Sequence, residues 1–144
     1  MAPCRRGYPR SVLSAPAVRE RTVTVLRTVL PAIPGSVAAG RRYACDVLVS
    51  RNVEPLVVET VELLTSEVMT YALRTARGTR QELRIELAAD QVCVQVSDSL
   101  VLTARRRMLA GPQGRSRTVI DTLADNWGLV VEPHGRHMWF TVVR

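Results

Sequence analysis

Two adjacent stretches of alternating apolar and polar residues constrain this fold more than any other feature. The apolar positions are Leu83, Ile85, Leu87, Val92, Val94 and Val96. Ala89 and Asp90 lie between the two stretches, where a turn is expected. The spacing predicts a β-hairpin with one face buried and the other in contact with solvent. A hairpin of this kind needs other elements to cover its apolar face.

Residues 56–77 predict a helix that supplies this cover. Residues Val57, Val61, Leu64, Val68, Ala72 and Ala76 recur at steps of three or four, which is the period of one buried helical face. Glu67 precedes Tyr71 by four residues, so both lie on one side of the helix. The pattern leaves two interpretations of Glu67 open: a solvated residue at the edge of the stripe, or an acid or base held over a pocket.

The rest of the chain predicts an α+β fold. Asp98 ends the second strand of the hairpin. We expect a strand at 22–30, a helix at 34–50, a loop at 99–113, a helix at 114–126 with Trp127 on its apolar side, and strands at 129–131 and 138–143. Such elements favour a mixed, mostly antiparallel sheet covered on one face by helices. Residues 1–21 predict a flexible basic arm, and 22–144 a single domain.

Composition is that of an ordinary soluble protein. The 144 residues are 47% hydrophobic and 23% charged, and no apolar run is long enough to cross a membrane. The formal net charge is +7, and every basic side chain apart from histidine is arginine. This charge reflects either a coding bias or an acidic partner or phosphate ligand. The three cysteines have no metal-type spacing, so we expect reduced thiols and a cytoplasmic protein.

Four segments, in this order, resemble the histidine-kinase-type ATPase domain, the Bergerat fold. Within that superfamily they are most similar to the anti-sigma-factor serine kinases of actinobacteria. The segments are VAAGRRYACDVL at 37–48, ELLTSEVMTYALRTA at 62–76, VQVSDS at 94–99 and GRSRTVIDTLADNWG at 114–128. The likeness extends over roughly residues 22–143.

The resemblance implies roles for particular residues. Glu67 would be the general base, and Asp98 would accept a hydrogen bond from the adenine amino group. Gly111 and Gly114 would let backbone N–H groups approach the phosphates of ATP, and Arg115 lies where that loop meets the following helix. The cofactors would be ATP and Mg²⁺. The protein would phosphorylate a serine of an anti-anti-sigma partner, while a sigma factor competes for the same chain, and family members also form homodimers.

Several positions depart from the family pattern. Tyr71 stands where the family has the Asn that holds Mg²⁺, and a phenol is a poor ligand for a hard cation. Leu100 and Ser116 stand where glycines are expected, and Arg117 replaces an aliphatic residue. Because phosphoryl transfer depends on positioning and on the metal, these changes reduce catalysis more than folding.

Three functions follow from these residues. The first is an ATP-binding serine/threonine kinase of the anti-sigma type. The second is a catalytically weakened or inactive pseudokinase that acts by sequestering a protein partner. The third is nucleic-acid binding through the arginines of the arm and of residues 105–117, but the chain has few aromatic side chains on which bases stack, which argues against direct contact with nucleic acid.

Overall fold

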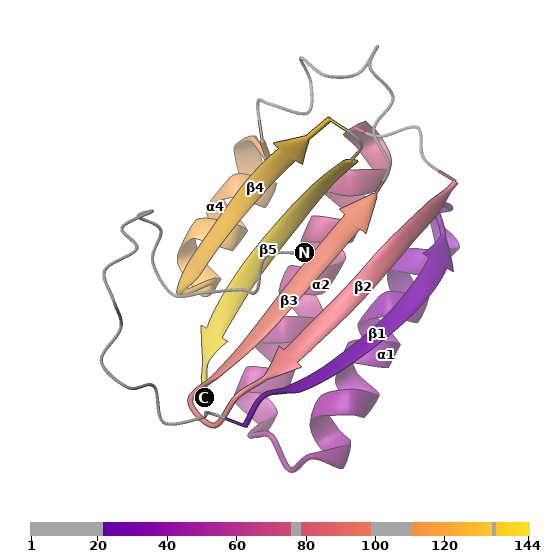
Figure 1. The fold of residues 1–144 in the computed structure, drawn as a ribbon. Coiled ribbons are helices and arrows are strands. Elements are labelled where there is room, and N and C mark those ends of the chain that lie inside the picture. The colour runs from indigo at the N-terminus through magenta and orange to yellow at the C-terminus, as the bar shows by residue number, and fades with distance from the viewer. Residues whose placement is uncertain (1–21, 76–78, 99–110, 134) are drawn as a thin grey trace, which may run out of the picture.

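The computed structural model describes residues 22–75, 79–98, 111–133 and 135–144 (Figure 1). Its five strands form one sheet in the order β1-β2-β3-β5-β4, and every pairing is antiparallel. The strands are β1 (Thr24–Pro31), β2 (Arg80–Leu87), β3 (Gln91–Asp98), β4 (Asn126–Glu132) and β5 (Gly135–Val143). The helices are α1 (Gly35–Ser50), α2 (Pro55–Thr75) and α4 (Gly114–Leu123).

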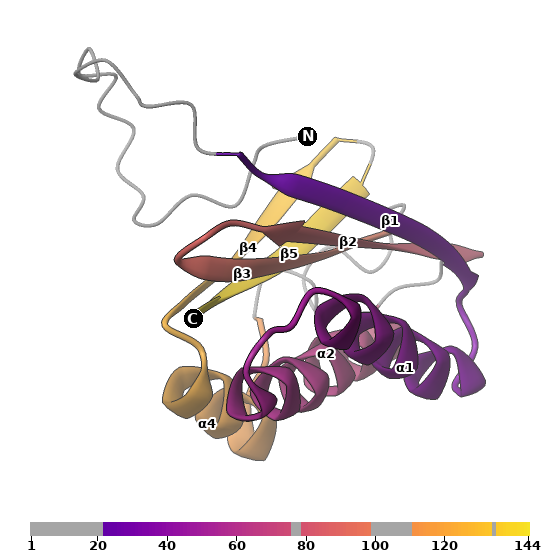
Figure 2. The same cartoon turned by 90° about the horizontal axis from the view of Figure 1, so that it is seen from below.

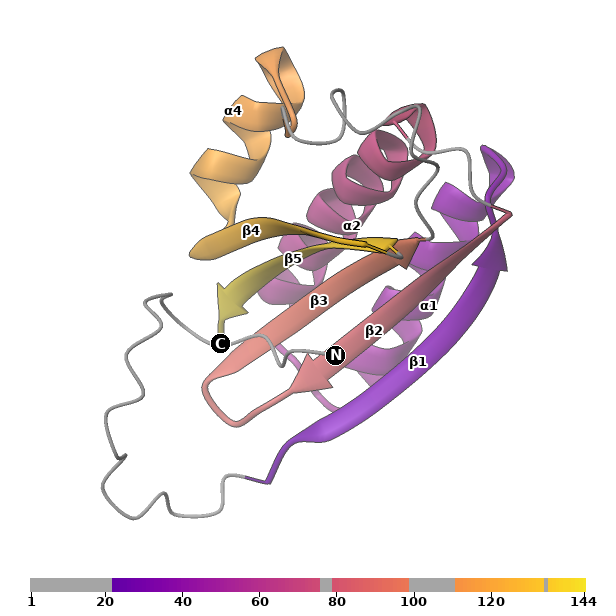
Figure 3. The ribbon, with the colours of Figure 1, turned by 45° about the horizontal axis from the view of Figure 1, so that its top comes forward.

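The three helices lie on one face of the sheet (Figures 2 and 3). The predicted hairpin forms from β2 and β3, with Ile85 opposite Val94 and Leu83 opposite Val96. Their side chains face the helices, because residues two apart on a strand share a face. The predicted α+β architecture with helices on one face is therefore confirmed. The sheet is not mixed, however, since all described strand pairs are antiparallel.

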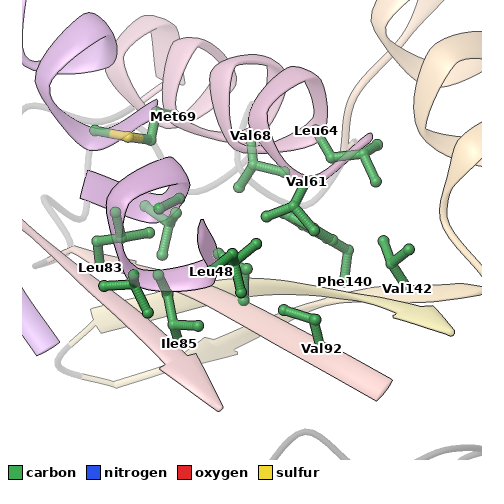
Figure 4. Packing of buried hydrophobic residues seen from close by; sticks show 14 of the residues in the cluster. Leu48, Val61, Leu64, Val68, Met69, Leu83, Ile85, Val92, Phe140 and Val142 are labelled. Carbon is green, nitrogen blue, oxygen red and sulfur yellow. The ribbon is translucent and has the colours of Figure 1, made fainter. Parts of the chain in front are cut away.

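Helix α2 packs along the middle of this face and forms the centre of the core. Its buried stripe contains Val57, Val61, Leu64 and Val68, as the spacing predicts. Figure 4 shows this stripe opposite Phe140 and Val142 of β5 and the inner residues of β2 and β3. The packing fixes which side of α2 faces the sheet, and so where Glu67 and Tyr71 lie.

The predicted helix at 114–126 is three residues too long. Helix α4 ends at Leu123, and Ala124 has an extended backbone (φ −81°, ψ 138°). Trp127 is not on the helix: it lies in β4 opposite Phe140, and its indole Nε1 donates to Asp121 Oδ1 at 2.8 Å. Pairing with β5 takes this segment into the sheet, because long-range strand contacts override local helical spacing.

The prediction that the second face of the hairpin is solvated is wrong. Arg84, Glu86, Cys93 and Gln95 point away from the helices and are nevertheless buried. Arg84 and Glu86 form an ion pair there, so their charges neutralise one another. Alternation alone does not distinguish a solvated polar residue from a buried polar residue that has a partner. Cys93 is disulfide-bonded and Cys45 is free, so the expectation of reduced thiols fails for Cys93.

The predicted N-terminal arm and the expected lack of a membrane-spanning segment concern the whole chain, of which the structure describes a part. The basic arm at 1–21 lies outside the described residues, so the proposed division into an arm and one domain stays a prediction. Within the described residues, no helix combines the length and apolar character needed to cross a bilayer.

A glycine in β4 provides a test of the packing on the outer face. A Cβ at Gly128 would lie 2.8–2.9 Å from the ring atoms of Trp139, which is a buried and rigid side chain. We expect Gly128→Ala to lower the free energy of unfolding by about 1–3 kcal/mol, because overpacking forces the indole to shift. Urea denaturation followed by circular dichroism measures the change.

The matched control is Gly35→Ala, since no atom lies within 4 Å of a Cβ at that position. This variant should keep the wild-type stability or gain slightly, because alanine favours helix more than glycine does. Equal stabilities of Gly128→Ala and wild type would contradict the described contact.

Candidate functional site

The Asp98 carboxylate, predicted to bind adenine, is paired with an arginine of the same chain. Asp98 ends β3 and lies opposite Arg136 near the start of β5. Arg136 Nε donates to Asp98 Oδ1 at 2.9 Å, and Arg136 Nη2 donates to Oδ2 at 2.9 Å. The side chain of Arg136 is 2% exposed and that of Asp98 is 3% exposed. The result is a buried, two-pronged ion pair, the strongest geometry available to these groups.

The other donors of Arg136 reach the C-terminal end of α2. Arg136 Nη2 also donates to the backbone carbonyl of Ala72 at 2.8 Å, and Nη1 donates to the hydroxyl of Thr75. The Thr75 hydroxyl in turn donates to the Tyr71 carbonyl at 2.7 Å. The guanidinium therefore joins the end of α2, the end of β3 and the start of β5 at one point.

Tyr71 closes another side of the same cluster. Its ring lies below the Arg136 guanidinium, 5.3 Å from its central carbon, which is within range of a cation–π interaction. Burial raises the pKa of the phenol, while the charge of Arg136 and hydrogen bonds to the Thr75 side chain and the Gly111 backbone oppose the increase. The ring thus fills space between α2 and the residues that precede α4.

The charge on Asp98 depends on its arginine partner. Burial raises the pKa of this carboxyl above its ordinary value, and hydrogen bonding and charge from Arg136 counteract part of that increase. Loss of the guanidinium would leave the desolvation unopposed. The ion pair is therefore what keeps a carboxylate charged inside the protein.

Glu67, the predicted general base, lies one helical turn before Tyr71 and is half-buried. Its Oε2 accepts a hydrogen bond from the hydroxyl of Ser116 at 2.8 Å. Ser116 is in the first turn of α4, where the family has glycine. A residue that departs from the family pattern therefore contacts the carboxylate expected to act as base.

Both glycines at the start of α4 and just before it have a left-handed backbone conformation. Gly111 and Gly114 have positive φ values of 68° and 60°, which residues with a Cβ rarely adopt. Arg115 follows Gly114 at the start of α4 and is exposed. Leu100 and most of the predicted loop at 99–113 lie outside the described residues. The described end of that loop is near Tyr71 through Gly111, but no described contact joins Glu67 to Asp98.

The arrangement of these side chains does not fit adenine or Mg²⁺. An adenine amino group would have to share the Asp98 carboxylate with Arg136, which donates hydrogen bonds to both oxygens. Tyr71 presents a buried phenol where a magnesium ligand would be required. Among the described residues, no three acidic, histidine or cysteine side chains are placed to hold a metal ion. Among the described residues, one hollow is lined by Asp98 together with Val29, Arg80, Glu82 and Ser97, and Glu67 does not line that hollow.

Sequence reasoning missed Arg136 entirely. The residue follows a glycine at the start of a strand and carries no motif of its own. It meets Asp98 only because β5 pairs with β3, in a register that places the two residues directly opposite one another. A prediction of strand order and register would have placed Arg136 opposite Asp98. The alternation of residues within single strands does not reveal this contact.

Removal of the arginine should destabilise the protein in a pH-dependent manner. Arg136→Met leaves the Asp98 carboxylate buried and unpaired, so we expect a loss of about 3–5 kcal/mol at pH 7. In this variant the folded-state pKa of Asp98 rises further above its unfolded value. The folded state then binds a proton that the unfolded state lacks, so stability is retained at low pH and lost as the pH rises through the folded pKa.

Urea denaturation of wild type and Arg136→Met between pH 4 and pH 8 measures the difference in their free energies of unfolding. We expect this difference to become smaller as the pH is lowered. A second substitution, Asp98→Leu in the Arg136→Met background, removes the unpaired charge. It should recover most of the stability at pH 7, because apolar replacements of a whole buried ion pair are often neutral. If the difference in free energy of unfolding between wild type and Arg136→Met does not change with pH, Asp98 and Arg136 do not form a buried ion pair.

Comparison with known proteins identifies the fold. No protein-family model and no curated protein matches the sequence. A solved structure of the RsbU and RsbW domains of Rv1364c from Mycobacterium tuberculosis is similar, with a TM-score of 0.63 and 15% identity, over 84% of this chain and 33% of that one. This chain thus spans about a third of that protein's length.

A chain of the SiaB–SiaC complex from Pseudomonas aeruginosa is also similar, with a TM-score of 0.54 and 12% identity over 83% of this chain and 89% of that one. At these identities the likeness establishes the fold alone. The chain has an RsbW-like α+β fold, in agreement with the architecture expected of a histidine-kinase-type ATPase domain.

Proposed function

We propose that this chain is a regulatory protein that binds a protein partner without ATP, on the fold of an anti-sigma-factor serine kinase. One observation carries the proposal: both oxygens of the Asp98 carboxylate accept hydrogen bonds from Arg136 in a buried ion pair. An adenine amino group would compete with Arg136 for this carboxylate, and an adenine that displaced the guanidinium would leave a buried cation without its anion. Breaking such pairs costs about 3–5 kcal/mol, which is comparable to the whole binding free energy of a weak ligand.

The other departures from the family pattern support the same conclusion. Tyr71 stands where the family has its magnesium ligand, and its ring packs against the Arg136 guanidinium. Ser116 occupies an oxygen of Glu67, the expected base. ATP and Mg²⁺ binding therefore stay predictions of the family resemblance, and the arrangement of side chains favours the alternative in which catalysis is lost.

The proposed partner is an anti-anti-sigma protein, a sigma factor, or both. Two arguments support a protein partner. The sequence segments resemble kinases that act on such proteins, and one of the structurally similar chains comes from a complex of two proteins, SiaB and SiaC. A homodimer remains part of the expectation from the family. By this proposal the chain withholds its partner by binding it, and no phosphoryl transfer is required.

The competing function is an ATP-dependent serine kinase. It is favoured by Glu67 itself, a half-buried carboxylate at the position to which the resemblance assigns the general base. In a kinase of this type the acceptor would be a partner's serine in place of Ser116. Nucleotide binding and phosphoryl transfer distinguish the two functions.

The first test measures ATP binding by isothermal titration calorimetry, with and without Mg²⁺, in four proteins: wild type, Tyr71→Asn, Arg136→Ala and the double variant. Wild type should bind ATP more weakly than about 1 mM. Tyr71→Asn alone should not restore binding, because Arg136 still occupies Asp98. Binding that appears only in the double variant would identify a lapsed nucleotide site, and Mg²⁺-dependent micromolar binding by wild type would overturn the proposal.

The second test measures partner binding directly. Anti-anti-sigma proteins and sigma factors from the source organism are titrated with the chain in the absence of nucleotide, with ATP and Mg²⁺, and with ADP and Mg²⁺. We expect at least one to bind with the same Kd under all three conditions. A Kd that falls tenfold or more with ATP, or a phosphorylated serine on the partner by mass spectrometry, would establish the kinase instead.

A further inference from the structure

The groups around Arg136 form a binding site for a guanidinium ion. The carboxylate of Asp98 accepts two N–H groups, the Ala72 carbonyl accepts a third, and the Thr75 hydroxyl accepts a fourth. A guanidinium has five N–H donors in one plane, so four of its five donors have partners here. The Tyr71 ring lies across the face of the ion.

We propose that this is a guanidinium-binding site whose ligand is part of the chain. It rests on the proposed function and extends it: Arg136 takes the place of a dissociable ligand and holds the end of α2 against the sheet permanently. At this end β3 and β5 are joined by their strand pairing, whereas the end of α2 is joined to them in the described contacts by Arg136 and by packing.

The site selects a planar cation by its geometry. The Asp98 oxygens match the parallel N–H groups of a guanidinium or amidinium, whereas an ammonium has three donors arranged tetrahedrally and cannot reach all of these acceptors. A neutral urea has a similar plane but lacks the charge that the buried carboxylate requires. The Ala72 carbonyl lies in the last turn of α2, where the helix dipole also favours a cation.

By this proposal, the site holds the end of α2 in one position without nucleotide. Ala72 and Thr75 belong to the last turn of α2, and the same helix carries Glu67 and Tyr71. Arg136 ties this turn to the ends of β3 and β5, so the helix end cannot move away from the sheet unless the hydrogen bonds from Arg136 to Ala72 and Thr75 break. A surface formed by this end of α2 is therefore presented to a partner in a single, ligand-independent state.

Chemical rescue tests the inference. Arg136→Ala removes the ion and leaves its acceptors in place. Thermal unfolding of this variant is followed by circular dichroism with methylguanidinium, methylammonium or N-methylurea, each at roughly 1–20 mM, far below denaturing concentrations. We expect methylguanidinium to raise the Tm of the variant by roughly 5 °C at the highest concentration, with an increase that becomes logarithmic in concentration above the Kd. Methylammonium and N-methylurea should have little effect.

Two matched proteins serve as controls. Gly128→Ala is destabilised without losing a charged group, so methylguanidinium should not raise its Tm. Asp98→Asn in the Arg136→Ala background removes the anion, so the rescue should disappear. If Arg136→Ala is unfolded at 25 °C, the same titration is read as recovery of a cooperative unfolding transition.

The outcomes separate this inference from the proposed function. No rescue, an equal effect of methylammonium, or an equal effect on Gly128→Ala would overturn the guanidinium site, even if wild type ignores ATP. Micromolar ATP binding by wild type would overturn the proposed function whatever the rescue shows. Rescue by methylguanidinium alone, lost on removal of the Asp98 charge, would establish the site.

Discussion

The buried ion pair between Asp98 and Arg136 is the interaction on which the rest of this site depends. Both groups would be costly inside a protein if either were alone, because a charge without a partner loses its hydration. Together, and with the carbonyl of Ala72 and the hydroxyl of Thr75, they satisfy almost all of the guanidinium donors. Through these hydrogen bonds, the pair fixes the position of the end of α2 relative to the end of the sheet.

This interaction gives the unusual residues of the sequence a common explanation. Tyr71 is too large for a ligand pocket but suits the face of a guanidinium, and its ring lies against Arg136. Ser116 gives Glu67 a neutral hydrogen-bond donor in the absence of any other described partner. Two of the departures from the family pattern, Tyr71 and Ser116, therefore contact Arg136 and Glu67 respectively. These two contacts are consistent with the proposed protein-binding role.

The fold was largely predictable because it follows from patterns within short segments. The alternation at Leu83 and Val94 and the helical period of α2 depend on neighbouring residues and on burial of one face. The errors arose where distant contacts prevail. Trp127 left the predicted helix because β4 pairs with β5, and Gln95 is buried on a face whose polar residues suggested solvent. Neither contact is encoded in the spacing of nearby residues.

By itself, the sequence determined the elements, their order, the likeness to a histidine-kinase-type ATPase domain and the positions of Glu67 and Asp98, because periodicity and motifs are properties of contiguous residues. Only the tertiary structure decided what those carboxylates contact. Asp98 meets Arg136 through the pairing of β3 with β5, and Glu67 meets Ser116 through the packing of α4 on α2. Residues that are 38 and 49 positions apart are brought within hydrogen-bond distance by the closing of the sheet and its helical layer, which no local pattern specifies.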